Sequence, residues 1–512
     1  MSPDEISGGG DFDRRTLLKG AALAGLASTA GPIAAANAET RRSRGAIARE
    51  NRRQGTTDWQ LTYTKVDPGT RYRCPWIEGY ASHASVKQGE SIDVMVSTNP
   101  PARFAIDFFR MGYYGGTGAR HMLAVGPLQG VTQPDPAVGP ERLRECEWIP
   151  SASIRIPEDW ISGVYLGKLS LVDTPPDARC ESYVVFIVRD DRPADIVFQC
   201  SDNTWQAYNR WPSQFSLYDD GESEWALKAG VRVGYGRPYG KYCQVVDAPL
   251  SQGSGEFLLW EFPMAYWLER EGYDVTYISN TDVHKDAACI ARAKAMLSVG
   301  HDEYWSLEQF RNVKAAVAAG VNVGFFSGNT CCFVAPLEPD GRGRAARTFT
   351  RAGRYGGLLE TERERMGPFP IEGPNEATLI GARTISPFNG AGDWIVADPA
   401  QWMFDGTGLR KGEGIPGLVG WEFHGDPARI DGLAIVAEGI AANGAGESAH
   451  WTSTLYPGPK NNWVFNASTI YWAQGLSNPP GHVLPYAHYG RPHGPDERVE
   501  RITRNILDRF TA

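Results

Sequence analysis

The fold is decided by the stretch AMLSVGHDEYWS, residues 295–306, in which an apolar run ends in one imidazole and two carboxylates. Residues 295–299 have the length and apolar character of a buried strand. The segment Ser306-Leu307-Glu308-Gln309 has a capping-box pattern, which predicts a helix that begins there and ends at Gly320. The apolar run 321–326 predicts the next strand. This strand–helix–strand order is typical of a βαβ unit, so we predict a parallel sheet.

The same alternation continues on both sides of this unit. Strands are predicted at residues 194–200, 274–278, 429–437 and 463–467, and helices at 256–270 and 497–510. Strands that alternate with helices of this length indicate βαβ units and a parallel sheet. We therefore predict that residues 193–512 form a parallel-sheet α/β domain.

The first part of the chain has a different pattern. Short runs with partial alternation are separated by turns rich in proline and glycine, and they predict strands at residues 91–96, 104–109, 163–169 and 182–188. Several short strands without a helical run are typical of a β-sandwich, which we predict over residues 58–192 with an immunoglobulin-like arrangement. Residues 39–57 are polar and contain six arginines, so we interpret them as a flexible lead-in.

Composition limits the class of protein. The 512 residues carry a formal charge of −9, with 42% hydrophobic and 22% charged residues, which is ordinary for a globular protein and excludes a disordered chain, a coiled coil or a polytopic membrane protein. The acidic excess argues against a nucleic-acid partner, because binding phosphates requires basic surfaces.

The N-terminus resembles a twin-arginine (Tat) export signal. Arg14 and Arg15 precede a weakly apolar stretch, residues 20–35, and Ala36-Asn37-Ala38 offers small residues for cleavage. A membrane anchor is the alternative, but the stretch is rich in Ala and Gly and contains Pro32. We expect residues 1–38 to be removed, which leaves a periplasmic or secreted protein without a membrane segment. That compartment permits disulfides, and the eight cysteines allow 105 complete pairings, among which the sequence cannot choose.

Three predicted strands end in polar segments, at residues 201–209, 300–305 and 327–332. In open parallel sheets, ligands bind beyond the carboxyl ends of the strands, so we expect these segments to converge on one rim. Residues 236–240, in the long insertion after the first of these strands, are placed to fold over them. The alternative for residues 300–305 is that Asp302 or Glu303 only caps the following helix.

Six short motifs together resemble the large (β) subunit family of N,N-dimethylformamidase, from about residue 79 to residue 507. They are TWQAYN at 204–209, RPY at 237–239, WLE at 267–269, GHDEYWS at 300–306, SGN at 327–329 and VFNA at 464–467. The resemblance implies a β-sandwich region followed by an α/β domain like that of class I glutamine amidotransferases. It also implies hydrolysis of a small amide at a mononuclear iron, held by two tyrosines and one glutamate.

Carried over residue by residue, the resemblance implies that Tyr208, Tyr239 and Glu303 hold the metal, which is expected to be Fe3+ because phenolate and carboxylate are hard ligands. His301 is expected to act as a base or proton shuttle and Asn329 as a hydrogen-bond donor to the developing oxyanion. The family has proline where this chain has Asp302. A homo-oligomer and a small partner subunit are both left open.

Glu422 is a further candidate, because Glu422 and His424 are two residues apart and would share one side of a strand. The alternative is a surface pair. Two other interpretations of the whole protein remain. One is a thiol hydrolase that uses Cys331, although no glycine follows the cysteine as a nucleophile elbow requires. The other is a non-catalytic protein that binds a carbohydrate or a partner on exposed tryptophans, for which the candidates are Trp205, Trp211, Trp260 and Trp305.

Overall fold

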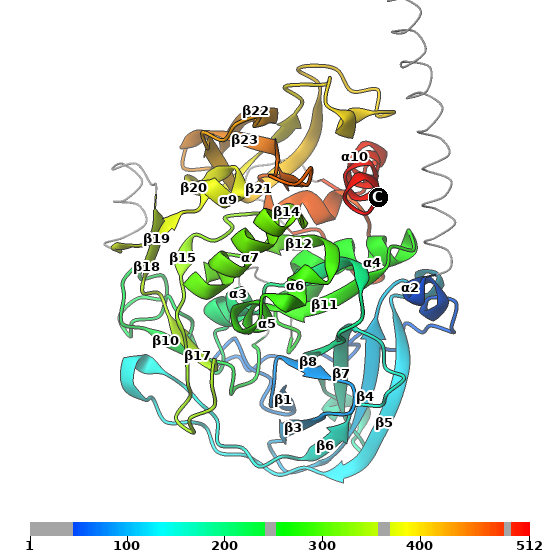
Figure 1. The fold of residues 1–512 in the computed structure, drawn as a ribbon. Coiled ribbons are helices and arrows are strands. Elements are labelled where there is room, and N and C mark those ends of the chain that lie inside the picture. The colour runs from blue at the N-terminus through cyan, green and yellow to red at the C-terminus, as the bar shows by residue number, and fades with distance from the viewer. Residues whose placement is uncertain (1–44, 241–251, 357–368, 486–492) are drawn as a thin grey trace, which may run out of the picture.

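The computed structural model describes residues 45–240, 252–356, 369–485 and 493–512 (Figure 1). The predicted export signal, residues 1–38, and Cys243 lie outside the described residues. Among the helices within those ranges, none combines the length and the hydropathy that a membrane span requires.

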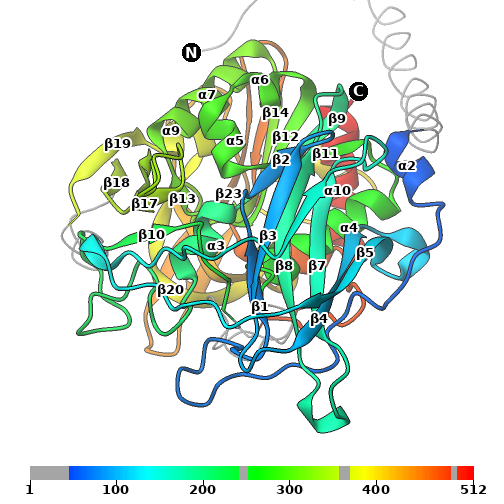
Figure 2. The ribbon, with the colours of Figure 1, turned by 90° about the horizontal axis from the view of Figure 1, so that it is seen from below.

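Two β-sheets form the N-terminal part of the described chain. Their strands are β1 (Glu78–Ala81), β2 (Ser85–Lys87), β3 (Ser91–Ser97), β4 (Arg103–Met111), β5 (Ala119–Gln129), β6 (Ala152–Arg155), β7 (Gly163–Leu171) and β8 (Glu181–Arg189). One sheet has the order β1-β3-β6 and the other β2-β8-β7-β4-β5. Side chains of both sheets, including Val94, Ile106 and Phe186, share one core, and Figure 2 shows β1 and β3 lying over β8 and β7. The four predicted strands are confirmed, while the immunoglobulin-like arrangement stays a prediction.

A nine-stranded sheet forms the centre of the C-terminal part, in the order β11-β9-β12-β14-β24-β23-β22-β20-β21. The strands are β9 (Ala194–Cys200), β11 (Val275–Ser279), β12 (Ala293–His301), β14 (Asn322–Gly328), β20 (Ala382–Ile395), β21 (Gly414–Pro427), β22 (Ala434–Ala442), β23 (Ser448–Pro457) and β24 (Trp463–Asn466). The neighbours from β11 to β24 are parallel, as predicted.

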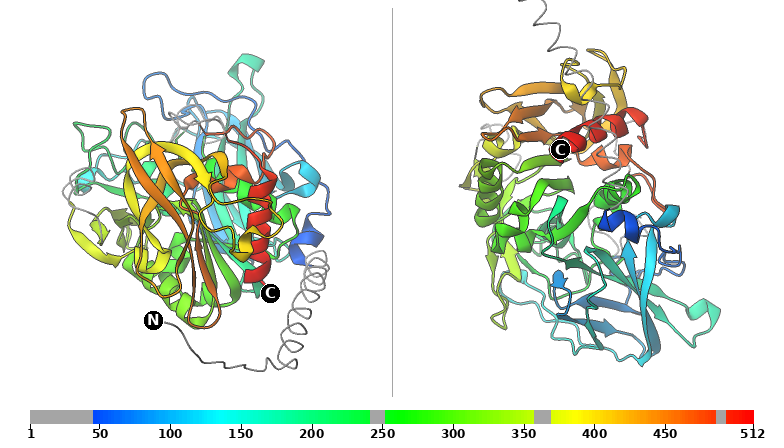
Figure 3. Two further views of the ribbon diagram at one scale, coloured as in Figure 1. Left: turned by 90° about the horizontal axis from the view of Figure 1, so that it is seen from above. Right: turned by 45° about the vertical axis from the view of Figure 1, so that its right-hand side comes forward.

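The other half of this sheet corrects the prediction of a wholly parallel sheet. Strands β20 to β23 pair antiparallel with their neighbours. For β22, β23 and β24 this follows from their short connections, which can join only antiparallel strands. The strand predicted at 429–437 begins only at Ala434, after a turn. Figure 3 shows these strands, in yellow and orange, on the opposite side of the green parallel strands from the blue and cyan sandwich.

Helices cover both faces of the parallel strands. The helices of the described chain are α2 (Ala46–Glu50), α3 (Asp202–Tyr208), α4 (Phe262–Arg270), α5 (Asn280–Lys285), α6 (Ala288–Ala291), α7 (Leu307–Ala319), α9 (Ala377–Ile380) and α10 (Glu497–Phe510). On one face Leu297 packs with apolar residues of α4 and α10, and on the other Met296 packs with α7. Successive strand residues thus point to opposite faces and both are buried, which explains the nearly continuous apolar run in β12.

Several predicted helix features can be compared with the structure. Ser306 caps α7 by accepting a hydrogen bond of 3.0 Å from the Gln309 amide, and Gly320 ends the helix at a φ of 106°. The reciprocal half of the capping box is not formed, because the Gln309 Oε1 atom accepts no hydrogen bond from the described residues, while its Nε2 group donates to Gln199 at 3.0 Å. The helix predicted at 256–270 is a π-helical turn, η5 (Phe257–Glu261), followed by α4.

Short elements complete the described chain. One small sheet contains β13 (Tyr304–Trp305), β15 (Phe333–Val334), β18 (Gly353–Gly356) and β19 (Ile371–Asn375). A second small sheet contains β10 (Arg232–Gly234), β16 (Leu337–Glu338) and β17 (Thr348–Thr350). The 3-10 helices are η1 (Tyr114–Gly116), η2 (Pro140–Arg142), η3 (Pro176–Ala178), η6 (Trp402–Phe404) and η7 (Ile470–Gly475). Helix α2 lies within the predicted flexible lead-in, residues 39–57. It is folded because Ile47 is fully buried in the core and Asn51, just after it, donates to Glu269 at 2.8 Å.

Candidate metal centre

The carboxyl ends of three parallel strands bring the predicted site together. Strand β12 lies between β9 and β14. The segment after β9 forms α3, which carries Tyr208. The end of β12 carries His301, which is in register with Gly328 on β14, so that Glu303 and Asn329 follow at the same edge. The convergence predicted from the polar strand ends is therefore observed.

Two glycines of the motifs are required by close approach. Gly300 has a φ of 72°, and a Cβ atom built on it would lie 2.6 Å from the Cβ of Trp260. A Cβ atom on Gly328 would lie 2.2 Å from the backbone oxygen of Glu422. Side chains at either position would displace the segments that form the site, so only glycine lets the backbones meet here.

His301 lies between two carboxylates. Its Nε2 atom is 3.1 Å from Glu303 Oε2 and 2.8 Å from Glu422 Oε2. The Asn329 Nδ2 group donates to the same Glu422 oxygen at 2.8 Å. All four side chains are buried, with at most 5% of each residue exposed. The surface alternative for Glu422 and the helix-cap alternative for Glu303 are both wrong, since Glu422 is buried on β21 and Glu303 points into this group.

Three phenols adjoin Glu303. The Tyr208 hydroxyl donates to Glu303 Oε2 at 2.7 Å and lies 2.8 Å from the Tyr218 hydroxyl. Tyr218 in turn is 3.5 Å from Glu303 Oε1 and 2.7 Å from the Tyr304 hydroxyl. The Thr204 hydroxyl accepts from the Glu303 amide at 3.0 Å and so holds this turn against α3. Tyr218 and Tyr304 were not predicted as site residues.

Burial and charge act together on these groups. Burial lowers the pKa of His301, but the charges of Glu422 and Glu303 outweigh it and raise that pKa well above its usual value. Burial raises the pKa of Glu422, and the charge of Glu303 adds to the effect. Burial and the charge of Glu303 also raise the pKa of Tyr208 well above its ordinary range. Extra positive charge would therefore stabilise the ionised acids and phenols.

These residues fit a metal ion. Ligand atoms of His301, Glu303 and Glu422 all lie within 4.8 Å of one another. The two carboxylates and the adjoining phenols of Tyr208 and Tyr218 are the oxygen donors that hard cations prefer. The Asn329 Oδ1 atom is buried and has no hydrogen-bond partner among the described residues. The cluster of His301, Glu303 and Glu422 could thus bind a metal ion.

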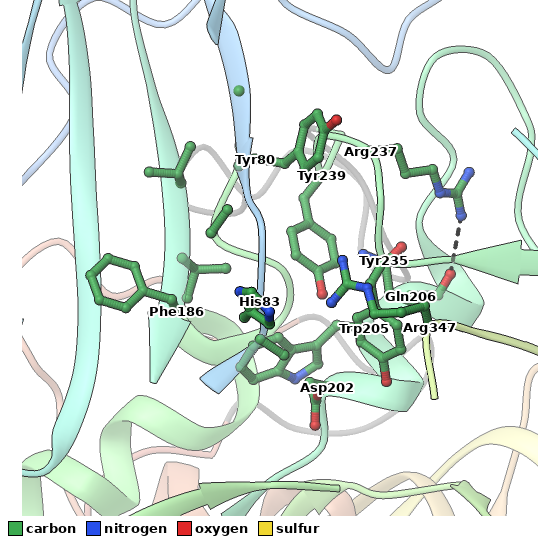
Figure 4. Close-up of a pocket in the computed structure, with 16 residues that line it drawn as sticks. Tyr80, His83, Phe186, Asp202, Trp205, Gln206, Tyr235, Arg237, Tyr239 and Arg347 are labelled. Atoms are coloured by element: carbon green, nitrogen blue, oxygen red, sulfur yellow. Dashed lines mark hydrogen bonds between the residues drawn. The ribbon is translucent and has the colours of Figure 1, made fainter. Parts of the chain in front are cut away.

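Tyr239 lies on the wall of a small cavity between the sandwich and α3 (Figure 4). The cavity holds about 20 Å³ and is also lined by Trp205, Tyr235 and Arg347. The ring of Tyr239 is 6.3 Å from that of Trp205. The structure therefore places Tyr239 beside the helix that carries Tyr208, and metal binding by Tyr239 stays a prediction.

The structure weakens both alternative interpretations. Burial raises the pKa of the Cys331 and Cys332 thiols well above the usual value, which is unsuited to a thiolate nucleophile. The tryptophans proposed as a stacking surface are each at most 2% exposed: Trp205, Trp211, Trp260 and Trp305. They are core residues and cannot form an exposed carbohydrate platform.

A comparison with known protein families gives a match over most of the chain. No curated protein matches the chain. Residues 105–486 match the sequence model of the family described as N,N-dimethylformamidase beta subunit-like, C-terminal. The match begins in β4, inside the predicted sandwich domain, and spans well over half of the chain. It includes every residue of the cluster described above. The chain therefore belongs to the N,N-dimethylformamidase beta subunit-like family.

Proposed function

We propose that this protein is an exported, metal-dependent amidohydrolase that cleaves the C–N bond of a small linear amide. The observation that carries the proposal is the buried group of Tyr208, Tyr218, His301, Glu303 and Glu422 at the strand ends. Family membership supports amide hydrolysis. The group combines anionic ligands with a proton carrier, as metal-dependent hydrolysis requires.

We assign a single ferric ion to Tyr208, Tyr218 and Glu303. Two phenolates and a carboxylate are hard anionic ligands, which suit a trivalent iron better than copper or zinc. The raised pKa of each phenol means that a strongly polarising cation has to displace its proton. Tyr218 replaces Tyr239 in this assignment because its hydroxyl lies close to both Tyr208 and Glu303.

The surrounding side chains have separate roles in this proposal. When bound, the ferric ion supplies Lewis acidity toward the amide carbonyl and toward water. His301 carries a proton from the water to the leaving amine, since its Nε2 atom faces the cluster. Glu422 orients His301 and stabilises its charged form. Asn329 orients Glu422 through the bond of 2.8 Å, and we assign to its amide the donation of a hydrogen bond to the developing oxyanion.

The test combines elemental analysis with the visible spectrum of the purified protein. Ligation of iron by tyrosinate should give a charge-transfer colour, which Tyr208→Phe and Tyr218→Phe should shift or abolish. Tyr456→Phe is the matched control, because Tyr456 is also buried but its hydroxyl donates to the Leu379 carbonyl. N,N-dimethylformamide is the first substrate to assay.

Each outcome has a distinct meaning. If Tyr239→Phe alters the colour and Tyr218→Phe does not, the second phenolate is Tyr239, as the family resemblance implies. A wild-type protein that is colourless, free of metal and fully active would refute the metal-dependent mechanism. Export is tested separately by sequencing the N-terminus of the secreted protein, which should begin at Glu39.

A further inference from the structure

We propose that Cys74 and Cys180 form a disulfide bond in the mature protein. Their Sγ atoms lie 3.1 Å apart, although 106 positions separate the two residues in the sequence. Both are buried, with 3% and 1% of their surface exposed. The sulfurs are already within contact distance, about 1 Å beyond the length of a disulfide bond.

The backbone around the two cysteines is held in place by other contacts. On the Cys180 side, the Glu181 amide donates to the Tyr63 carbonyl at 2.9 Å, and the Ser182 hydroxyl donates to the Ile77 carbonyl at 2.8 Å. The Glu181 carboxylate accepts from the Thr62 amide at 2.7 Å. These bonds join the segment 62–77 to the start of β8 on both sides of the thiol pair. The two thiols therefore meet in a prearranged position.

The other described cysteines occupy different surroundings. Cys74 and Cys180 share the core of the sandwich. Cys146, Cys200 and Cys289 lie in three other clusters. Cys331 and Cys332 are adjacent in sequence at the metal-site end of the sheet. The sequence leaves open 105 complete pairings of the eight cysteines. The structure favours those pairings that contain the Cys74–Cys180 bond.

The chemistry requires an oxidant, which we take to be a disulfide of low molecular weight or of an exported oxidoreductase. The Cys180 thiolate attacks this disulfide and releases one oxidant thiol. The Cys74 thiolate then displaces the second oxidant thiol, forming the bond between Cys74 and Cys180. In total two protein thiols lose two electrons and two protons, and the oxidant disulfide becomes two thiols. The hydrogen bond from Cys74 and the charge of Lys65 lower the pKa of Cys180, which suits the attacking role.

The bond would fasten the segment before β1 to the sandwich. It would close a loop of about one hundred residues, and long closed loops lose the most conformational freedom in the unfolded chain. The inference does not depend on the hydrolase proposal, because neither thiol belongs to the metal centre. It does favour an oxidising destination for the chain.

The experiment uses the reduced full-length protein, treated with excess oxidised glutathione during refolding and then alkylated in denaturant. Trypsin cleaves after Arg73 and Arg179, so each cysteine lies alone in one peptide, 74–87 or 180–189. Mass spectrometry should find these two peptides linked, and linked again in protein recovered after export. Recovery of both peptides alkylated, or separately joined to glutathione, would overturn the proposal.

Variants give an independent measurement. A reductant should lower the melting temperature of the wild-type protein toward that of the Cys74→Ser/Cys180→Ser double variant, and leave the double variant unchanged. Cys289→Ser is the control, and it should keep the full response to the reductant. Equal melting temperatures for oxidised and reduced wild type would count against the bond. The peptide analysis of the wild type remains decisive where a variant does not fold.

Discussion

At the scale of single residues, the centre of the site is one imidazole nitrogen shared by two acids. His301 Nε2 lies 3.1 Å from Glu303 and 2.8 Å from Glu422, and both acids are buried. Two negative charges in a buried site are costly unless positive charge lies near them. The two acids nevertheless differ, because Glu303 also contacts phenols while Glu422 contacts only His301 and Asn329 in the bonds described above. Their roles should therefore separate on mutation.

Glu422→Gln should lower kcat with little change in KM, because it removes the charge that stabilises protonated His301 while it preserves the shape of the side chain. We expect a loss on the order of 10²-fold to 10⁴-fold, the usual range for proton transfer by a positioned side chain. Steady-state kinetics on a small amide, together with the iron content, would measure this effect.

The matched control for that variant is Glu438→Gln. Glu438 lies on β22, in the antiparallel half of the sheet, and pairs with His450 at the surface with 44% of its side chain exposed. It should leave kcat unchanged. Loss of iron together with loss of activity in Glu422→Gln would instead show that Glu422 is a metal ligand.

At the scale of elements, the N-terminus of α7 directly follows the turn that carries Glu303. The helix begins at Leu307, and its N-cap is Ser306, three residues after Glu303; the Ser306 hydroxyl accepts from the Gln309 amide. The same hydroxyl lies 2.8 Å from His284 Nδ1, so it also joins α7 to the end of α5. Loss of the Ser306 hydroxyl should therefore loosen the turn that carries Glu303.

Ser306→Ala should reduce the free energy of unfolding by about 1 to 2 kcal/mol, since it removes a helix cap and leaves the Gln309 amide without its acceptor. Urea unfolding measures the change. Ser91→Ala, at an exposed position at the start of β3, is the control and should change stability by less than about 0.5 kcal/mol. Equal effects of the two substitutions would show that the cap contributes nothing to stability.

At the scale of the whole molecule, the sandwich and the α/β part are joined by a buried ion pair. Arg110 on β4 and Glu269 on α4 contact at 2.7 Å, and neither side chain is exposed. Asn51 and Tyr277 also donate to Glu269, at 2.8 and 3.1 Å. The WLE motif at 267–269 therefore serves the junction between the two layers rather than the metal centre.

Glu269→Gln should destabilise the protein by about 3 to 5 kcal/mol, because it leaves the buried Arg110 charge without its partner. Replacing both residues, as in Arg110→Met/Glu269→Leu, should cost less than the sum of the single changes. Asp173→Asn, which breaks the exposed pair with Arg103, is the control and should cost less than about 1 kcal/mol. Additive single and double variants in urea unfolding would contradict this account.

Patterns among neighbouring residues were enough to predict the local elements and the edge of the sheet at which the site lies. β9 coincides with the predicted strand 194–200 and α10 with the predicted helix 497–510, because an apolar run or a helical periodicity is a property of neighbouring residues. The polar ends of β9, β12 and β14 also pointed to one rim, since parallel strands share their carboxyl edge. That geometry predicted the segments that contain His301, Glu303 and Asn329, while the roles of these residues came from the family resemblance.

Only the tertiary structure decided which distant side chains complete the site. Tyr218 lies in a loop without periodicity, and its contact with Glu303 spans 85 positions, so no local pattern could assign it. Glu422 was a candidate from its spacing to His424, but its contact with His301 depends on the close approach of the β21 backbone to Gly328. The change from parallel to antiparallel pairing and the folding of α2 likewise depend on packing partners far along the chain. Local sequence determines secondary structure, whereas contacts between distant segments are decided by the packing of the whole molecule.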